Sequence, residues 1–134
     1  MKTTHLLLCV GALISTMNFS ACKKYEEGPR LSLHTKKARI ANEWKYEKVT
    51  SPNGTDVTSY YVNDYIEIKK DGNFISDNGV GTWQFGSDKE IIVFTFSGGS
   101  SMIWNIIKLK NNELWTTYAS SSPSGLYEFH LIPR

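Results

Sequence analysis

The sequence predicts an all-β protein, an eight-stranded up-and-down antiparallel β-barrel with a short N-terminal helical turn. Between residues 44 and 132, short runs of β-branched and aromatic residues alternate with polar residues. Clusters of Gly, Asn and Asp separate these runs at regular intervals, which is typical of consecutive hairpins. The connections are too short to contain crossover helices, so the strands follow one another as a meander. Closing the meander into a barrel removes its exposed edges.

The first 21 residues have the composition of a secretion signal and are not expected to join the fold. Lys2 supplies the positive charge of a signal-peptide n-region, and residues 6–17 form an apolar run too short to span a bilayer. Small residues then precede Cys22, an arrangement that resembles the lipobox of bacterial lipoproteins. That resemblance implies that the signal peptide, residues 1–21, is removed and that Cys22 carries the lipid. The alternative is an ordinary signal peptide followed by a chance cysteine.

Cysteine content and charge restrict the mature chain further. Cys9 lies inside the signal, so only Cys22 remains, which excludes a disulfide framework and a thiolate metal site. Removing Lys2 with the signal leaves 14 basic and 13 acidic residues in the mature chain. This balance argues against nucleic acid or an anionic membrane face as the main partner, because both need a basic field. We expect instead a membrane contact through the lipid on Cys22.

Residues 22–32 predict a flexible, lipid-anchored tether that leads into the barrel domain, residues 33–134. The tether is polar, contains Gly28-Pro29 and buries too little apolar surface to fold alone. About ten extended residues reach roughly 35 Å. The charged residues after Cys22 resemble export signals that send some lipoproteins of Gram-negative bacteria to the cell surface, and the alternative is a solvated linker. We expect the protein to be anchored in the bacterial outer membrane, on its periplasmic face or at the cell surface.

The domain begins with one or two predicted helical turns, because apolar residues between 33 and 44 recur at helical spacing. The clearest hairpin signal after it is Asp71-Gly72, since Gly takes positive φ without steric cost. Alternation along the strands separates an inward from an outward face. Alternation does not decide which residues between 102 and 110 face inward, because apolar side chains occupy both faces there. A bulge or burial of both faces has to settle it. The eight predicted strands are residues 44–49, 61–69, 73–76, 81–85, 91–96, 102–110, 113–119 and 126–132.

The two ends of the predicted barrel differ in their connections. Successive turns of a meander alternate between the ends, which places 70–73, 86–89 and 111–112 together at one end. The longer connections, rich in Ser and Gly, gather at the other end, which we name the mouth; they are residues 51–59, 77–80, 97–101 and 120–125. Function concentrates in long loops carried by a rigid scaffold. We expect the mouth to face away from the membrane and to bind a ligand.

Aromatic residues assigned to the inward face near the mouth are the predicted ligand contacts: Tyr61, Trp83, Phe96, Trp104, Tyr118 and Tyr127. Aromatic faces offer large rigid contact area, and the tyrosine hydroxyl orients a ligand. The alternative is a barrel filled by its own side chains, because eight strands enclose little space. A cavity of about 300 Å³ or more, lined by these aromatics, favours ligand binding. A packed interior favours an interaction or structural module.

The domain resembles the lipocalin-like lipoproteins of Gram-negative bacteria, within the wider calycin group. The resemblance covers residues 31–134 and is carried by Trp44, the Asp71-Gly72 turn, Gly81-Thr82-Trp83 and the segment 104–115. The sequence departs from the lipocalin Gly-x-Trp signature, because it has Asn42-Glu43-Trp44 at that point. The resemblance implies a barrel that binds small hydrophobic molecules without catalysis.

Catalytic and metal-binding patterns are not found. The mature chain has two histidines, His34 and His130, which are too far apart in the sequence to predict a metal site. No serine lies in a nucleophile motif, and no glycine-rich segment follows the pattern of a phosphate loop. The aspartates Asp56, Asp64 and Asp77 converge at the mouth in one arrangement, and are separate solvated loop residues in the other. We expect no enzyme activity and no cofactor.

The sequence therefore predicts a non-enzymatic, monomeric lipoprotein of the cell envelope. Its lipocalin-like domain is expected to bind a small apolar or amphipathic ligand at the mouth. The alternative is a module with a filled barrel that contacts a protein or glycan partner through its loops.

Overall fold

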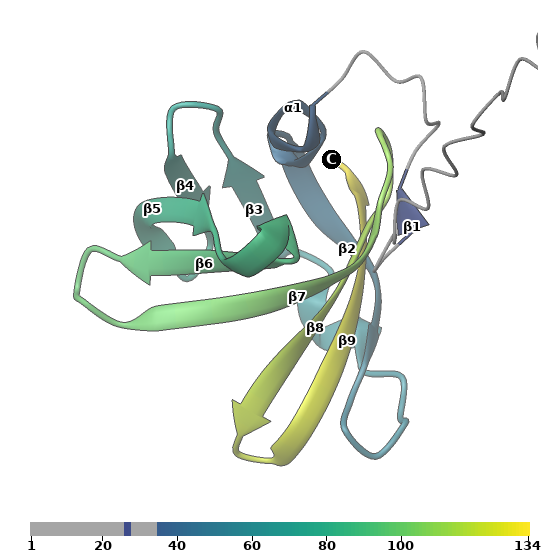
Figure 1. Cartoon of the computed structure of the whole chain (residues 1–134). Coiled ribbons are helices and arrows are strands. Elements are labelled where there is room, and N and C mark those ends of the chain that lie inside the picture. The colour runs from purple at the N-terminus through teal and green to yellow at the C-terminus, as the bar shows by residue number, and fades with distance from the viewer. Residues whose placement is uncertain (1–25, 28–34) are drawn as a thin grey trace, which may run out of the picture.

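The protein is a closed eight-stranded antiparallel β-barrel, as the sequence predicts. A computed structural model describes residues 26–27 and 35–134. Each strand from β2 to β8 pairs with the next, and β9 pairs with both β8 and β2, which closes the sheet (Figure 1). The strands are β2 (Glu43–Thr50), β3 (Tyr65–Ile68), β4 (Asn73–Ser76), β5 (Gly79–Phe85), β6 (Ile91–Phe96), β7 (Ser101–Leu109), β8 (Leu114–Ser121) and β9 (Ser124–Pro133).

Four short elements lie outside the barrel wall. They are β1 (Glu26–Glu27), α1 (Lys36–Ile40) and two 3-10 turns, η1 (Thr58–Tyr61) and η2 (Ser87–Lys89). Strand β1 falls within the predicted tether and pairs in parallel with the end of β7. The predicted signal peptide and Cys22 lie outside the described residues. In the part of the chain that the structure describes, no helix is both long and apolar enough to cross a bilayer.

One predicted strand begins later than expected. Residues 61–69 were predicted as a single strand, but β3 starts at Tyr65 because η1 occupies the preceding residues. The Asp56 carboxylate accepts hydrogen bonds from the backbone N–H and the hydroxyl of Thr58. Such local side-chain hydrogen bonds compete with strand pairing. The connection between β2 and β3 is therefore a compact folded loop.

Helix α1 closes the end of the barrel opposite the mouth. Thr35 caps it, because its hydroxyl accepts a hydrogen bond from the backbone N–H of Ala38. The helix ends at Ile40, so the helical spacing that extends to Trp44 in the sequence does not describe that residue, which lies on β2. The Trp44 indole N–H donates to the Ile40 carbonyl at 2.8 Å, and both side chains are fully buried. This bond ties α1 to the barrel wall.

Register shifts decide the faces that alternation left open. On β7, Trp104 and Ile106 point inward and Ile103 points outward. A bulge between Ile106 and Lys108 then moves the alternation by one residue, so that Leu109 is again inward. A similar shift on β2, between Tyr46 and Lys48, brings Val49 into the core. Both strands thus keep their apolar residues inside.

A column of aromatic rings fills the barrel. The ring centroids of Phe74 and Phe94 lie 5.1 Å apart, those of Phe94 and Trp104 5.0 Å, and those of Trp104 and Phe129 5.6 Å. Tyr46 continues the column from Phe129 at 5.3 Å. All four pairs meet edge to face, the geometry favoured by aromatic quadrupoles. The interior of the barrel is therefore packed with protein side chains.

Truncation of Trp44 tests the closure by α1. We expect Trp44→Ala to lower the free energy of unfolding by about 3–5 kcal/mol, because a fully buried ring is lost. Trp44→Phe should cost less, roughly 1–3 kcal/mol, because it leaves only the Ile40 carbonyl unpaired. Tyr60→Ala is the matched control, since that ring is 81% exposed and its loss should change stability by less than about 0.5 kcal/mol. Urea denaturation measures all three. A Trp44→Ala cost below about 1 kcal/mol contradicts the closure.

Candidate functional site

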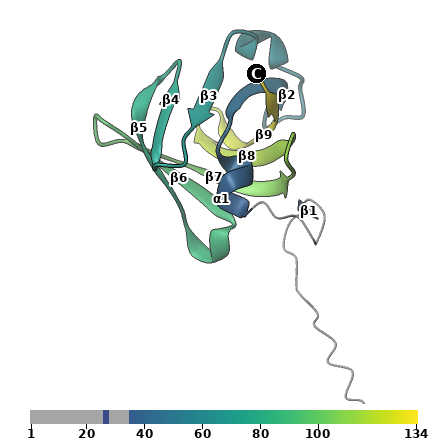
Figure 2. The ribbon, with the colours of Figure 1, turned by 90° about the horizontal axis from the view of Figure 1, so that it is seen from above.

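The mouth loops meet at one end of the barrel, as the alternation of turns predicts. Gly125 packs against Pro52 so closely that a Cβ on Gly125 would lie 2.6 Å from the Pro52 Cβ, which joins the β8–β9 and β2–β3 connections. The Ser97 N–H donates to the Val80 carbonyl at 3.0 Å, which joins the β6–β7 and β4–β5 connections. In Figure 1 the β8–β9 hairpin and the loop after β2 point away from α1. Figure 2 looks onto the opposite end, where α1 lies against β7.

Two adjoining hollows occupy the mouth. The larger, about 460 Å³, is named the tyrosine hollow and is lined by Val57, Tyr60, Tyr61, Asp64, Asn78 and Tyr127. The second, about 420 Å³, is named the proline hollow and is lined by Ser51, Pro52, Asn53, Val57, Pro123, Ser124 and Tyr127. Val57 and Tyr127 line both hollows, so the two hollows adjoin at these side chains. Each is within the volume range of sites for small molecules.

The aromatic column forms the base beneath these hollows. The Tyr61 and Tyr127 rings lie 6.1 Å and 6.3 Å from the Phe129 ring, centroid to centroid. Phe129 in turn contacts Trp104 inside the barrel. The hollows therefore end on packed rings and do not continue into an interior cavity.

The six predicted ligand contacts are spread along the barrel. Tyr61 and Tyr127 line the tyrosine hollow. Tyr118 is half-buried and stacks on Phe129 at 6.2 Å, and Phe96 is half-buried and meets Phe74 edge to face at 5.1 Å. These two belong to the rim of the packed core, and neither lines a hollow at the mouth.

The two predicted tryptophans lie elsewhere. Trp104 is fully buried in the aromatic column. Trp83 lies toward the α1 end, because its indole N–H donates to the Lys69 carbonyl at 2.7 Å and the Lys37 ammonium is 6.0 Å from its ring. Its predicted place near the mouth is wrong. Alternation gives the face of a residue, whereas its height along the barrel depends on the stagger of the strands.

Sequence reasoning missed several residues that line the hollows. Tyr60 is 81% exposed because η1 turns it out of the barrel wall, and Asn78 sits in the tight β4–β5 connection. The pattern Asp56-Val57-Thr58 could have indicated this turn in the sequence. An Asp two residues before a Thr favours a turn that is capped by the Asp side chain. Such a turn places the following tyrosines on a loop.

Two of the three mouth aspartates converge. The Asp64 and Asp77 side chains are hydrogen-bonded to each other, and Asp77 Oδ1 also accepts the Tyr65 N–H at 3.2 Å. Partial burial, followed by the charge and hydrogen bond of Asp77, raises the pKa of Asp64 above its ordinary value. Asp56 stays apart, and its hydrogen bonds from Thr58 lower its pKa. Burial, then the charges of Asp77 and Asp64, raises the pKa of Tyr46, which keeps that hydroxyl protonated at neutral pH.

The loops of the mouth carry acidic residues and no basic ones, while Lys48 at the end of β2 lies near enough to Asp56 to help lower its pKa. The connections 51–64, 77–78, 97–100 and 122–123 contain Asp56, Asp64 and Asp77 and no Lys, Arg or His. A concave site with one sign of charge attracts ligands of the opposite sign and repels ligands of its own. The mouth therefore favours neutral or positively charged molecules.

The residues of the hollows offer contacts for binding. Among the described residues that line them there is no His, Cys, Lys or Arg. Within residues 26–27 and 35–134 no cluster of three or more His, Cys, Asp or Glu side chains is suited to a metal ion. His130 lies on the outer face of β9, stacked on Trp115 at 3.8 Å and paired with Glu128. The site presents ring faces, hydroxyls, two side-chain amides and one carboxyl.

No protein-family model matches this chain, and no curated protein is similar to it. The barrel fold by itself does not identify a family, because one fold hosts many functions. The functional conclusion therefore depends on the geometry of the mouth.

Asp64→Asn tests the carboxyl pair through its pH dependence. Because the pKa of Asp64 is raised in the folded state, the folded chain binds more protons than the unfolded chain above the ordinary pKa of 3.8. The contribution of Asp64 to stability is thus highest in acid. It falls as the pH rises from the ordinary pKa of Asp64 to its raised pKa in the folded state. We expect Asp64→Asn to stabilise the protein at pH 7 by about 0.2–1 kcal/mol, the range for solvent-exposed charge pairs. The gain should disappear near pH 3 in denaturation curves.

Asp56→Ala is the matched control from the same loop. It removes a carboxylate that accepts hydrogen bonds from Thr58 and should lower stability at pH 7. Equal effects of the two substitutions at pH 7 contradict the pairing of Asp64 with Asp77.

Proposed function

We propose that the protein is a non-enzymatic, lipid-anchored binding module of the bacterial envelope. Its mouth binds a small amphipathic molecule across the tyrosine and proline hollows. The observation that carries the proposal is the pair of adjoining hollows, of about 460 and 420 Å³, walled by tyrosine and proline rings. The envelope address is inferred from the signal-like residues 1–21 and the lipobox-like end at Cys22.

The chemistry of the walls supports an amphipathic ligand. Tyr127 and Val57 lie between the two hollows and offer apolar surface to one molecule that spans both. Tyrosine hydroxyls, Asn78 and Asp64 supply the few polar contacts that fix orientation in a small-molecule site. The three aspartates of the mouth favour a ligand whose polar part is neutral or positively charged.

The packed interior changes the mode of binding that the lipocalin-like resemblance implies. A ligand inside the barrel has to displace the Phe94, Trp104 and Phe129 rings, which pack against one another at 5.0 and 5.6 Å. Close-packed cores resist such insertion, because overpacking forces side chains off their rotamers. The ligand is therefore proposed to rest on the rim, with its apolar part on Tyr61 and Tyr127.

A second candidate function is the binding of a protein or glycan partner through the same end. Exposed apolar side chains support it, because contiguous patches of this kind mark interaction sites. Large exposed hydrophobic residues of the mouth connections, or of strand ends next to them, are Tyr60 (81% exposed), Val62 (70%), Val80 (50%), Leu126 (55%) and Ile103 (47%).

Native mass spectrometry of the protein purified from its own host tests the first candidate. We expect a co-purifying small molecule on the native chain. Tyr60→Ala combined with Asn78→Ala should reduce its occupancy at least about tenfold, because two walls of the tyrosine hollow are removed without touching the core. Tyr65→Ala is the control, since that tyrosine lies on β3 under Arg134 and lines neither hollow.

The outcomes separate the candidates. A bare native chain that retains a protein or glycan through the mouth supports the second function. Equal loss of the small molecule from the control variant contradicts the rim site.

A further inference from the structure

The short strand β1 fixes how far the barrel lies from a lipid on Cys22; this step depends on the lipid anchoring proposed above. Glu26 and Glu27 pair in parallel with Lys108 and Leu109 of β7. Three residues lie between Cys22 and Glu26, and a fully extended chain covers at most about 14 Å in the four steps from one to the other. This distance is well below the roughly 35 Å reach of an undocked tether of ten residues.

The end of β7 is open to β1 because β6 does not extend that far. The β6–β7 ladder ends at the pair Ile91 and Asn105. Beyond it, the Ile106 N–H donates to the Glu90 carbonyl at 2.8 Å, after which β1 takes the place of β6 beside Lys108. Strand β1 thus docks by backbone pairing on an edge that the barrel leaves uncovered.

This docking point adjoins the closed end of the barrel. Arg39 of α1 donates through Nη1 to the carbonyl of Leu109, the residue that pairs with Glu27. From the same helix, Lys37 lies over the Trp83 ring, whose N–H donates to the Lys69 carbonyl in the β3–β4 connection. Strand β1 and the β3–β4 connection therefore each lie near α1.

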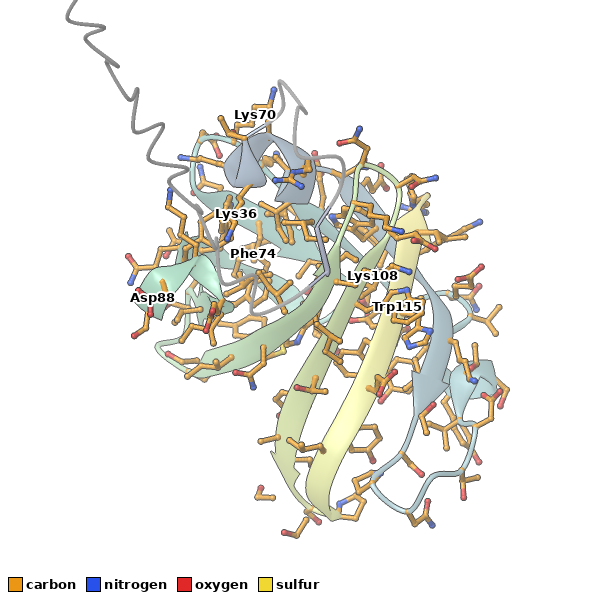
Figure 3. The ribbon with its side chains drawn as sticks, turned by 45° about the vertical axis from the view of Figure 1, so that its right-hand side comes forward. Lys36, Lys70, Phe74, Asp88, Lys108 and Trp115 are labelled. Carbon is orange, nitrogen blue, oxygen red and sulfur yellow. The ribbon has the colours of Figure 1, made fainter. Side chains whose placement is uncertain are left out.

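Charge is distributed unevenly between the two ends. The domain from residue 35 to 134 has eleven basic and eleven acidic side chains, so its net charge hides any local excess. Four lysines, Lys36, Lys37, Lys69 and Lys70, lie on α1 and the β3–β4 connection and are named the basic corner. Asp71 is the one acidic residue of segments 35–42 and 69–72, and the neighbouring β1 consists of two more acidic residues, Glu26 and Glu27. Figure 3 shows Lys36 and Lys70 close to α1 at the same end.

We propose that the basic corner is the membrane-facing surface of this protein and contacts anionic lipid headgroups. Two observations combine in this assignment: the docked β1 holds this end within reach of the lipid, and the lysines complement a negatively charged bilayer. A basic patch beside a lipid anchor supplies the second signal that strengthens membrane attachment.

The assignment also fixes the orientation of the mouth. The negatively charged mouth lies at the end opposite α1, so repulsion from an anionic bilayer favours the same orientation that the basic corner selects by attraction. The tyrosine and proline hollows then open away from the membrane.

Vesicle binding of the mature chain, residues 22–134 with Cys22→Ala, tests the surface without the lipid and without the apolar signal residues. We expect it to bind vesicles with about one third phosphatidylglycerol in phosphatidylcholine more strongly than pure phosphatidylcholine vesicles, and to lose this binding in high salt. Lys37→Glu with Lys70→Glu should lower the partition coefficient at least about tenfold. Lys45→Glu with Lys48→Glu is the control, because it reverses two exposed lysines of β2 outside the basic corner.

Three results overturn the proposal. They are equal binding to the two kinds of vesicle, an equal loss in the control variant, and binding that persists in high salt. Membrane fractionation of the native and Cys22→Ala chains in the host tests the anchor separately. A Cys22→Ala chain that stays in the membrane fraction, together with the expected vesicle results, contradicts the lipid anchor and supports the membrane contact of the basic corner. Release of that chain, together with equal binding to the two kinds of vesicle, supports the lipid anchor and contradicts the membrane contact of the basic corner.

Discussion

The aromatic column inside the barrel is the constraint on which the rest of the structure depends. Trp104 contacts Phe94 on one side and Phe129 on the other, and all three rings are buried. An eight-stranded barrel encloses little more volume than its own side chains occupy, so three large rings and their neighbours are enough to fill it. Binding is thereby displaced from the interior to the rim, where Phe129 supports the tyrosines of the mouth.

The two ends of the barrel have different properties because different elements cover them. At one end, α1 is fixed by the bond from Trp44 to Ile40 and is surrounded by lysines. At the other end, the β2–β3 connection folds over the rim without closing it, and its charges are all acidic. A chain with almost no net charge thus has one end suited to an anionic membrane and one suited to a neutral or cationic ligand.

Much of the fold was predictable because it depends on local pattern. Period-two alternation identified all eight strands, and Asp71-Gly72 was correctly predicted as a tight turn, with Gly72 at φ +92°. Alternation also separates the two faces correctly at Trp44, Phe94 and Leu114, which are fully buried, because an error of one residue would expose the entire apolar face of a strand.

The site was less predictable, because it depends on relations between distant segments. The height of Trp83 in the barrel follows from strand stagger, which no single strand encodes. The hydrogen bond between Asp64 and Asp77 joins two connections through tertiary packing, and the pairing of Glu26 with β7 requires an edge that appears only where β6 ends. The sequence left open whether the barrel is filled or holds a cavity, because volume is not visible in sequence.

Xenon binding followed by methyl NMR is the most direct test of the filled barrel. Xenon enters dry apolar cavities inside proteins but does not enter close-packed cores. The account predicts that xenon leaves the methyl groups of the fully buried Ile92 and Leu114 unchanged. Saturable shifts at Ile92 or Leu114 would reveal an interior cavity and contradict binding at the rim.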